Sequence, residues 1–118
     1  MNRSAAHTAL VNAILAELGA LPGVIMGINS SGQAREYNAD GEVVRRISYG
    51  WPTSDGGTDI LVAVAPLGRL VALEAKTGDA KAKPNQRAVH NALRAVGVVV
   101  AVVRSVDEAR RAIEEARM

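Results

Sequence analysis

The order of apolar segments predicts an α/β sandwich, with a central mixed β-sheet flanked by helices. Three observations favour it: an apolar stripe at helical spacing near the N-terminus, several apolar runs of strand length after it, and a final helix–strand–helix order. We expect residues 1–118 to form one domain, because this length supports a single modest core. Apolar residues make up 48% of the chain, which excludes a disordered protein.

The N-terminal half predicts one helix followed by three strands. Ser4 can cap the helix and Gly19 can end it. The apolar side chains of this helix share one face: Leu10, Val11, Ile14, Leu15 and Leu18. Residues 24–28 predict the first strand, and residues 34–37 and 42–49 predict a hairpin around an Asp-Gly turn.

The C-terminal half predicts a second hairpin and then helix, strand and helix. Residues 59–64 and 70–76 are joined by a loop short enough for antiparallel pairing. Pro84 suits the first turn of a helix, whose expected buried stripe is Ala88, Val89, Ala92, Leu93 and Val96. The wholly apolar run 98–103 predicts a strand covered on both faces. A closing helix, 106–117, is expected to bury Ala109, Ala112, Ile113 and Ala116.

Charged residues adjoin two of these apolar runs. Asp59 begins one run, and Glu74 closes the next, with Lys76 two residues later. Alternate residues of a strand share a face, so Glu74 and Lys76 should point the same way while Ala75 turns into the core. Two carboxylates and an ammonium would then converge at one end of the sheet. Such a constellation can hold a divalent cation against a phosphodiester.

This pattern resembles the PD-(D/E)xK nuclease superfamily and, within it, the VRR-NUC family of small nucleases. Residues 56–60, Gly-Gly-Thr-Asp-Ile, resemble the Gly-rich lead into the family's first metal-binding aspartate, and residues 74–76 are its ExK triplet. Gln86, ten residues after Lys76, resembles the family's glutamine on the following helix. Residues 102–105, Val-Val-Arg-Ser, resemble the segment that gives the family its name. Four elements in the right order are a far more specific signal than a lone ExK.

The resemblance implies a metal-dependent DNA endonuclease with Mg²⁺ as its cofactor, for which Mn²⁺ can substitute. Asp59 and Glu74 are the expected side-chain ligands, and the resemblance adds the carbonyl of Ala75. Lys76 would orient the attacking water or neutralise charge on the phosphate, and Gln86 would hydrogen-bond that water or the substrate. The resemblance also implies a homodimer that acts on branched DNA such as four-way junctions, in a phage or bacterial cytoplasm.

Positive charge is concentrated in the middle of the chain. The net charge is only +2, but residues 69–104 hold seven basic and two acidic side chains, which suits a polyanionic substrate. The expected nucleic-acid contacts are Lys81, Lys83, Arg87 and Arg104, although the two lysines, taken alone, are more typical of a solvated loop. Arg45 and Arg46 are consecutive in a predicted strand, so only one of them can face bound DNA.

Two departures from the family pattern keep other interpretations open. Related nucleases often carry an acid near the start of the first helix, where this chain has Ser4, His7 and Asn12. His7 can replace that acid or be an incidental surface residue. Asp55 can reach a metal through water or cap a turn, and the turn is favoured. The alternatives are a nucleic-acid-binding module with a degraded site and a restriction-type or tRNA-directed nuclease on the same scaffold.

Composition excludes several other classes. The chain has no cysteine, so disulfides and thiolate metal sites are excluded. No segment reaches the roughly 18 continuous apolar residues that span a bilayer. We therefore expect no membrane partner.

Overall fold

The computed structural model describes residues 4–52 and 57–118. The predicted Gly56 and Asp55 therefore lie outside the described residues. The order of elements confirms the predicted one: α1 (Ala5–Leu18), β1 (Val24–Ile28), β2 (Gly32–Tyr37), β3 (Val43–Tyr49), β4 (Ile60–Val64), β5 (Arg69–Ala75), α2 (Pro84–Ala95), β6 (Val99–Val103) and α3 (Val106–Arg117).

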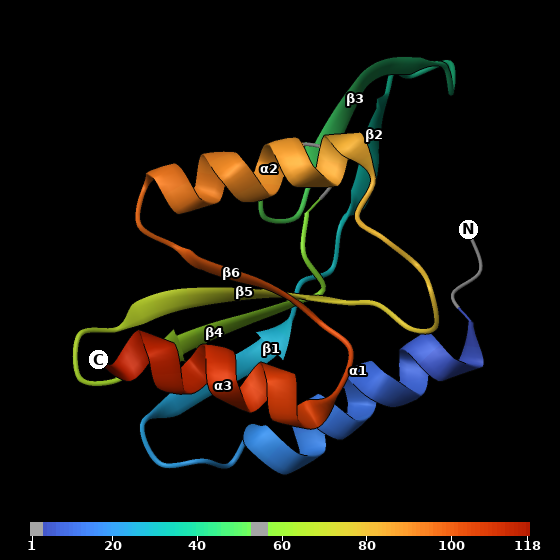
Figure 1. The fold of residues 1–118 in the computed structure, drawn as a ribbon. Helices are drawn as coiled ribbons and strands as arrows, with labels where there is room; N and C mark the ends of the chain where they lie inside the picture. The colour runs from blue at the N-terminus through green and yellow to red at the C-terminus, as the bar shows by residue number, and fades with distance from the viewer. Residues whose placement is uncertain (1–3, 53–56) are drawn as a thin grey trace.

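Four strands form a central sheet in the order β1-β4-β5-β6. β1 pairs antiparallel with β4 and β4 with β5, whereas β5 and β6 are parallel, so the sheet is mixed as predicted. β2 and β3 pair only with each other, as a hairpin that extends away from the body past α2 (Figure 1). Within the described ranges, no helix is long and apolar enough to cross a bilayer.

The helices cover both faces of the sheet (Figure 1). α1 and α3 pack on one face and build the main core, in which Ile14, Ile60 and Ile113 are fully buried. The predicted inward residues of α3, all but one of them alanines, are buried there. α2 covers the other face over a smaller cluster built on Ala72, Leu93 and Val100. Glu74 belongs to β5, and Asp59 directly precedes β4, in the sheet layer between the helices.

The buried face of α2 differs from the predicted stripe. Ala88, Ala92 and Val96 are exposed, and Val96 is 78% exposed. The side chains turned toward the sheet are Gln86, Val89, His90 and Leu93. They follow the helical spacing set by Gln86, which reaches across to Glu74 and Lys76. Val89 and Leu93 thus pack against the sheet as predicted, and the polar contacts of Gln86 join them on the same face of α2.

The burial of His90 should make stability sensitive to acid. Its imidazole is 2% exposed, and burial, then Arg94, then Lys76 lower its pKa below the ordinary 6.5. A lowered folded-state pKa means that the unfolded chain binds the proton more readily, so this stability is present above pH 6.5 and is lost as pH falls below it.

We expect the free energy of unfolding to fall more steeply between about pH 7 and about pH 5 in the wild type than in His90→Leu. Urea unfolding at several pH values measures this difference. Parallel pH profiles for the two proteins would show that His90 is not the titrating group.

Candidate active site

Asp59 and Glu74 lie next to each other across two paired strands. Ile60 pairs with Leu73, so the residue before Ile60 stands opposite the residue after Leu73. The N–H of Asp59 also donates to the carbonyl of Leu73 at 2.9 Å, which holds Asp59 against β5 beside Glu74. Asp59 is 6% exposed and Glu74 3% exposed. Two carboxylates are thus buried together at one end of the sheet, as the sequence predicts.

The backbone of Ala75 belongs to the same site. Its N–H donates to Asp59 Oδ2 at 2.8 Å, while the next N–H, of Lys76, donates to Val103 on the opposite edge at 3.0 Å. The N–H and C=O of one strand residue lie on the same edge, so the Ala75 carbonyl also lies on the edge of Asp59. Its side chain is 1% exposed and packs into the core, as predicted.

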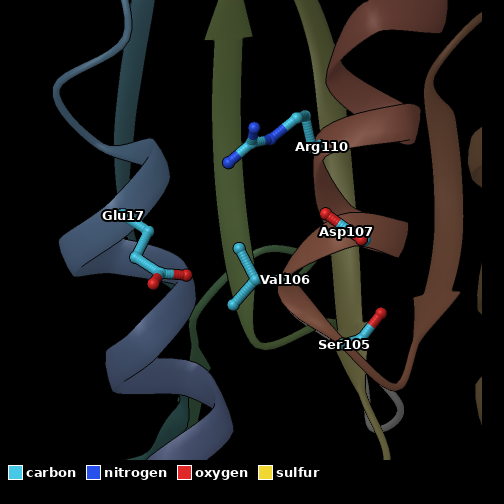
Figure 2. Close-up of a pocket in the computed structure, with 5 residues that line it drawn as sticks. All are labelled: Glu17, Ser105, Val106, Asp107 and Arg110. Atoms are coloured by element: carbon cyan, nitrogen blue, oxygen red, sulfur yellow. The ribbon is translucent and has the colours of Figure 1, made fainter.

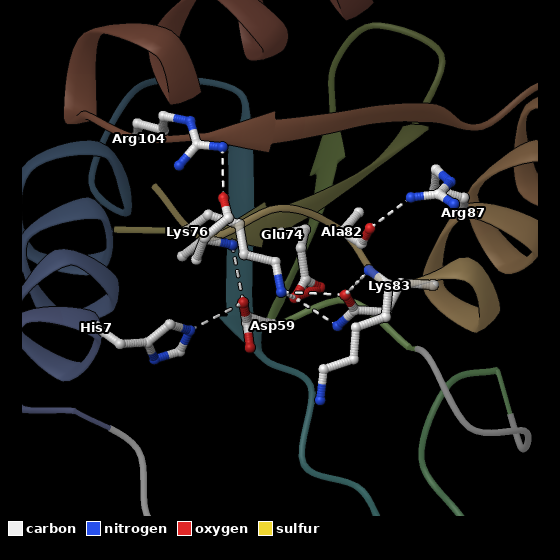
Figure 3. Close-up of polar contacts among 11 residues, drawn as sticks. His7, Asp59, Glu74, Lys76, Ala82, Lys83, Arg87 and Arg104 are labelled. Atoms are coloured by element: carbon white, nitrogen blue, oxygen red, sulfur yellow. Dashed lines mark hydrogen bonds and ion pairs between the residues drawn. The ribbon is translucent and has the colours of Figure 1, made fainter. Parts of the chain in front are cut away.

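Lys76 and Gln86 form a hydrogen-bonded network with Glu74, and Figure 3 shows Lys76 and Glu74 side by side. Lys76 Nζ donates to Gln86 Oε1 at 3.0 Å and lies 3.8 Å from Glu74 Oε1. Gln86 Nε2 lies 3.4 Å from the same Glu74 oxygen, and Gln86 Oε1 also accepts from the backbone N–H of Lys83 at 2.9 Å. Gln86 therefore joins the N-terminus of α2 to both charged side chains of the ExK triplet.

His7 approaches the site from the first turn of α1. Its Nε2 lies 3.3 Å from Asp59 Oδ2, and its side chain is 18% exposed. Ser4 begins the helix by accepting a hydrogen bond from the His7 N–H at 3.0 Å, which fixes this first turn. His7 is thus not an incidental surface residue, because it holds the carboxylate predicted to bind metal.

The chemistry of these groups suits a hard divalent cation. Carboxylate and carbonyl oxygens are the donors that Mg²⁺ prefers, and Asp59, Glu74 and Ala75 offer both kinds. Two neighbouring carboxylates repel each other when buried, and Lys76 supplies a positive charge beside Glu74. Among the side chains of residues 4–52 and 57–118, no three His, Cys, Asp or Glu groups could hold a metal together. Water and phosphate oxygens would have to complete the coordination.

Two of the predicted nucleic-acid contacts hold the loop between β5 and α2. Arg104 donates to the carbonyls of Gly78 at 3.1 Å and Ala80 at 2.6 Å, and Arg87 donates to Ala82 at 2.8 Å (Figure 3). Lys81 and Lys83, on the same loop, are exposed. The structure therefore brings Asp59, Glu74, Ala75, Lys76 and Gln86 together, whereas the four basic residues surround the loop beside them.

Asn29 is a buried site residue that the sequence analysis missed. Its Nδ2 donates to the carbonyls of Thr58, at 2.8 Å, and Trp51, and its Oδ1 accepts from the Trp51 N–H at 3.0 Å. Its own N–H donates to the Asp59 carbonyl at 2.8 Å. A Cβ on Gly57 would lie 3.1 Å from the Trp51 carbonyl, so a larger residue there would require Trp51 to shift by a few tenths of an ångström. An Asn that follows a strand and precedes a polar turn gave no sign of this role.

Removing the Asn29 amide should destabilise the protein. Asn29→Ala leaves buried backbone groups of Trp51 and Thr58 without their partner, at a cost of about 1–3 kcal/mol for each unsatisfied group. We expect a loss of about 2–4 kcal/mol in the free energy of unfolding, measured by urea titration. The exposed amide variant Asn91→Ala, on α2, is the control and should stay within about 0.5 kcal/mol of wild type. Equal effects of the two substitutions would contradict this role.

A separate hollow lies between α1 and α3 (Figure 2). Its volume is about 570 Å³, and its lining residues are Glu17, Ser105, Val106, Asp107 and Arg110. Glu17, the sole acid of the predicted first helix, therefore faces this hollow and not Asp59. None of the predicted site residues lines it.

Comparison with known proteins supports the fold. No family model and no curated protein matches the chain. Among solved structures, the chain is similar to one described as a VRR_NUC domain, with a TM-score of 0.58 and 21% identity. The match covers 94% of this chain and 97% of that chain, so it extends over nearly the whole domain. The chain has the fold of a VRR-NUC domain, as its ordered motif predicts.

Proposed function

We propose that the protein is a metal-dependent DNA endonuclease. One observation carries the proposal: Asp59 and Glu74 are buried side by side at the end of the sheet, with Lys76 on the same face, in the fold of a VRR-NUC domain. Buried neighbouring carboxylates cost stability unless a positive charge offsets them, and structural needs alone do not require such a pair.

Asp59, Glu74 and the Ala75 carbonyl would hold Mg²⁺, and Mn²⁺ can take its place. A bound divalent ion polarises the phosphate and makes water a better nucleophile at neutral pH. The protein's part is to keep the donor groups in place. The Ala75 N–H and His7 both bind Asp59 Oδ2, which fixes the orientation of that carboxylate.

Lys76 is the residue that would act on the substrate directly. Gln86 and Glu74 direct its ammonium into the site, where it would orient the attacking water and neutralise charge that develops on the phosphate. Gln86 is better described as a positioning residue, because its amide is already engaged by Glu74, Lys76 and the Lys83 backbone.

The proposed substrate is branched DNA such as a four-way junction, cut by a homodimer. Two cuts on opposing strands need two active sites. A two-fold symmetric dimer provides one active site for each strand. The edge strand β1 supports association with a second copy, because Ile25 is 78% and Ile28 57% exposed there. Lys81 and Lys83, with Arg87 and Arg104, would contact phosphates beside the cut.

A cleavage assay tests the proposal. Four-way junction, flap and linear duplex DNA of matched sequence are incubated with the protein in Mg²⁺, Mn²⁺ or EDTA. Cutting that needs metal and prefers the junction is the expected result. Preference for a specific linear sequence, or for tRNA, would instead favour a restriction-type or tRNA-directed nuclease.

The second candidate is a nucleic-acid-binding module whose nuclease site is degraded. The observation that favours it is His7, which contacts Asp59 from the helix where related nucleases carry an acid. This alternative predicts salt-sensitive binding of DNA without cleavage in either metal. Binding without cutting in the same assay would therefore replace the enzyme proposal with this one.

A further inference from the structure

The β2–β3 hairpin has two unlike faces. Opposed residues of an antiparallel pair share a face, and the register places Arg35 opposite Arg46. On the other face Glu36 stands opposite Arg45, and the two form an ion pair at 2.6 Å. Ala34 and Ile47 are opposed on that second face. Arg46, rather than Arg45, is therefore the arginine that belongs to a basic face.

The arrangement of Arg35 and Arg46 suits an external anion. Like charges placed directly opposite each other destabilise a strand pair. Every residue of β2 and β3 is exposed, and within the described part of the chain neither arginine takes part in an ion pair. The neighbouring pair, Glu36 with Arg45, shows how the same hairpin neutralises an arginine internally. A phosphate backbone would relieve the repulsion between Arg35 and Arg46.

The base of the hairpin is anchored beside the proposed active site. Asn29, which precedes β2, binds the Asp59 carbonyl, and its side chain binds Trp51, which follows β3. From there the hairpin extends away from the sheet (Figure 1). Six strand residues cover about 20 Å, which corresponds to about six base pairs of duplex.

We propose that the Arg35–Arg46 face of this hairpin binds the phosphate backbone of the duplex that flanks the scissile phosphate. The hairpin would act as an arm that positions the substrate and reads no sequence, because arginine contacts to phosphate carry none. The inference rests on the proposed function, since it takes DNA as the ligand. It adds a contact region, on β2 and β3, to the one formed by Lys81, Lys83, Arg87 and Arg104.

The test measures DNA binding in EDTA, where no cutting is expected, by fluorescence anisotropy over a range of salt concentrations. The probe is a duplex long enough to extend past the hairpin. Arg35→Gln/Arg46→Gln is compared with Arg110→Gln/Arg111→Gln, which removes the same charge from exposed positions of α3. Arg35→Lys/Arg46→Lys keeps the charge, and circular dichroism checks that each variant is folded.

The glutamine hairpin variant should bind about tenfold more weakly or worse, and the slope of log K against log salt should decrease by about 1.8, or 0.9 for each lost phosphate contact. The lysine variant should recover most of the binding affinity and most of the salt slope. Binding and salt slope equal to those of the α3 variant would overturn the inference, as would a wild type that binds no duplex. If the wild type cuts no DNA in any metal but the hairpin variant still binds DNA more weakly, the proposed nuclease activity is wrong and DNA binding by the hairpin is retained.

Discussion

Glu74→Gln should reduce metal-dependent cleavage on the order of 10³-fold or more. A metal that polarises a phosphoryl oxygen supplies several kcal/mol of transition-state stabilisation, and each 1.36 kcal/mol is a factor of ten in rate. Glutamine has the shape of glutamate but no charge, so it weakens the ion's attachment while it preserves packing at this buried position.

The rate is measured under single-turnover conditions on junction DNA, at an Mg²⁺ concentration that saturates the wild type, and Mn²⁺ affinity is measured by titration calorimetry. Glu17→Gln is the matched control, because it makes the same chemical change on an exposed residue in the α1–α3 hollow. The control should cleave as the wild type does. Cleavage by Glu74→Gln at the wild-type rate would show that Glu74 is not part of the active site.

Lys76→Met should reduce the rate on the order of 10²-fold and leave Mn²⁺ bound. Methionine keeps an unbranched side chain of similar length, so the change removes chiefly the ammonium. Loss of one group that stabilises charge in the transition state typically costs 10²- to 10³-fold. Without the ammonium, the two carboxylates lose a neighbouring positive charge, so the affinity for Mn²⁺ should stay the same or rise.

The two variants therefore separate two roles. Glu74→Gln should lose both Mn²⁺ affinity and cleavage, whereas Lys76→Met should lose cleavage alone. The same single-turnover assay and the same calorimetric titration serve both. A Lys76→Met protein that loses Mn²⁺ as Glu74→Gln does would show that Lys76 acts only by holding the site together.

The sequence predicted the elements well because each is encoded locally. Apolar spacing and caps such as Ser4 and Ser105 mark where helices begin, and period-two alternation placed Ala75 in the core and Glu74 and Lys76 together. The closeness of Asp59 and Glu74 followed from the short loop between β4 and β5, because a loop of this length can join only antiparallel strands. These features need no knowledge of distant contacts.

What the sequence did not predict depends on contacts between distant segments. Nothing in a helix pattern shows that Gln86 would reach Glu74, or that His90 would be buried while Val96 stays exposed. His7 contacts a residue 52 positions away, and Asn29 joins segments 22 and 29 positions away. The opposed arginines of the hairpin depend on a strand register that propensity does not fix.

The most direct test of the central claim is to locate the metal. Crystals grown with Mn²⁺ are measured near the manganese absorption edge, and the anomalous difference map shows where the ion binds. We predict a peak within coordination distance of Asp59, Glu74 and the Ala75 carbonyl, at about 2.0–2.3 Å. A map with no peak there, or with its only strong peak in the hollow of Glu17 and Asp107, would contradict the account.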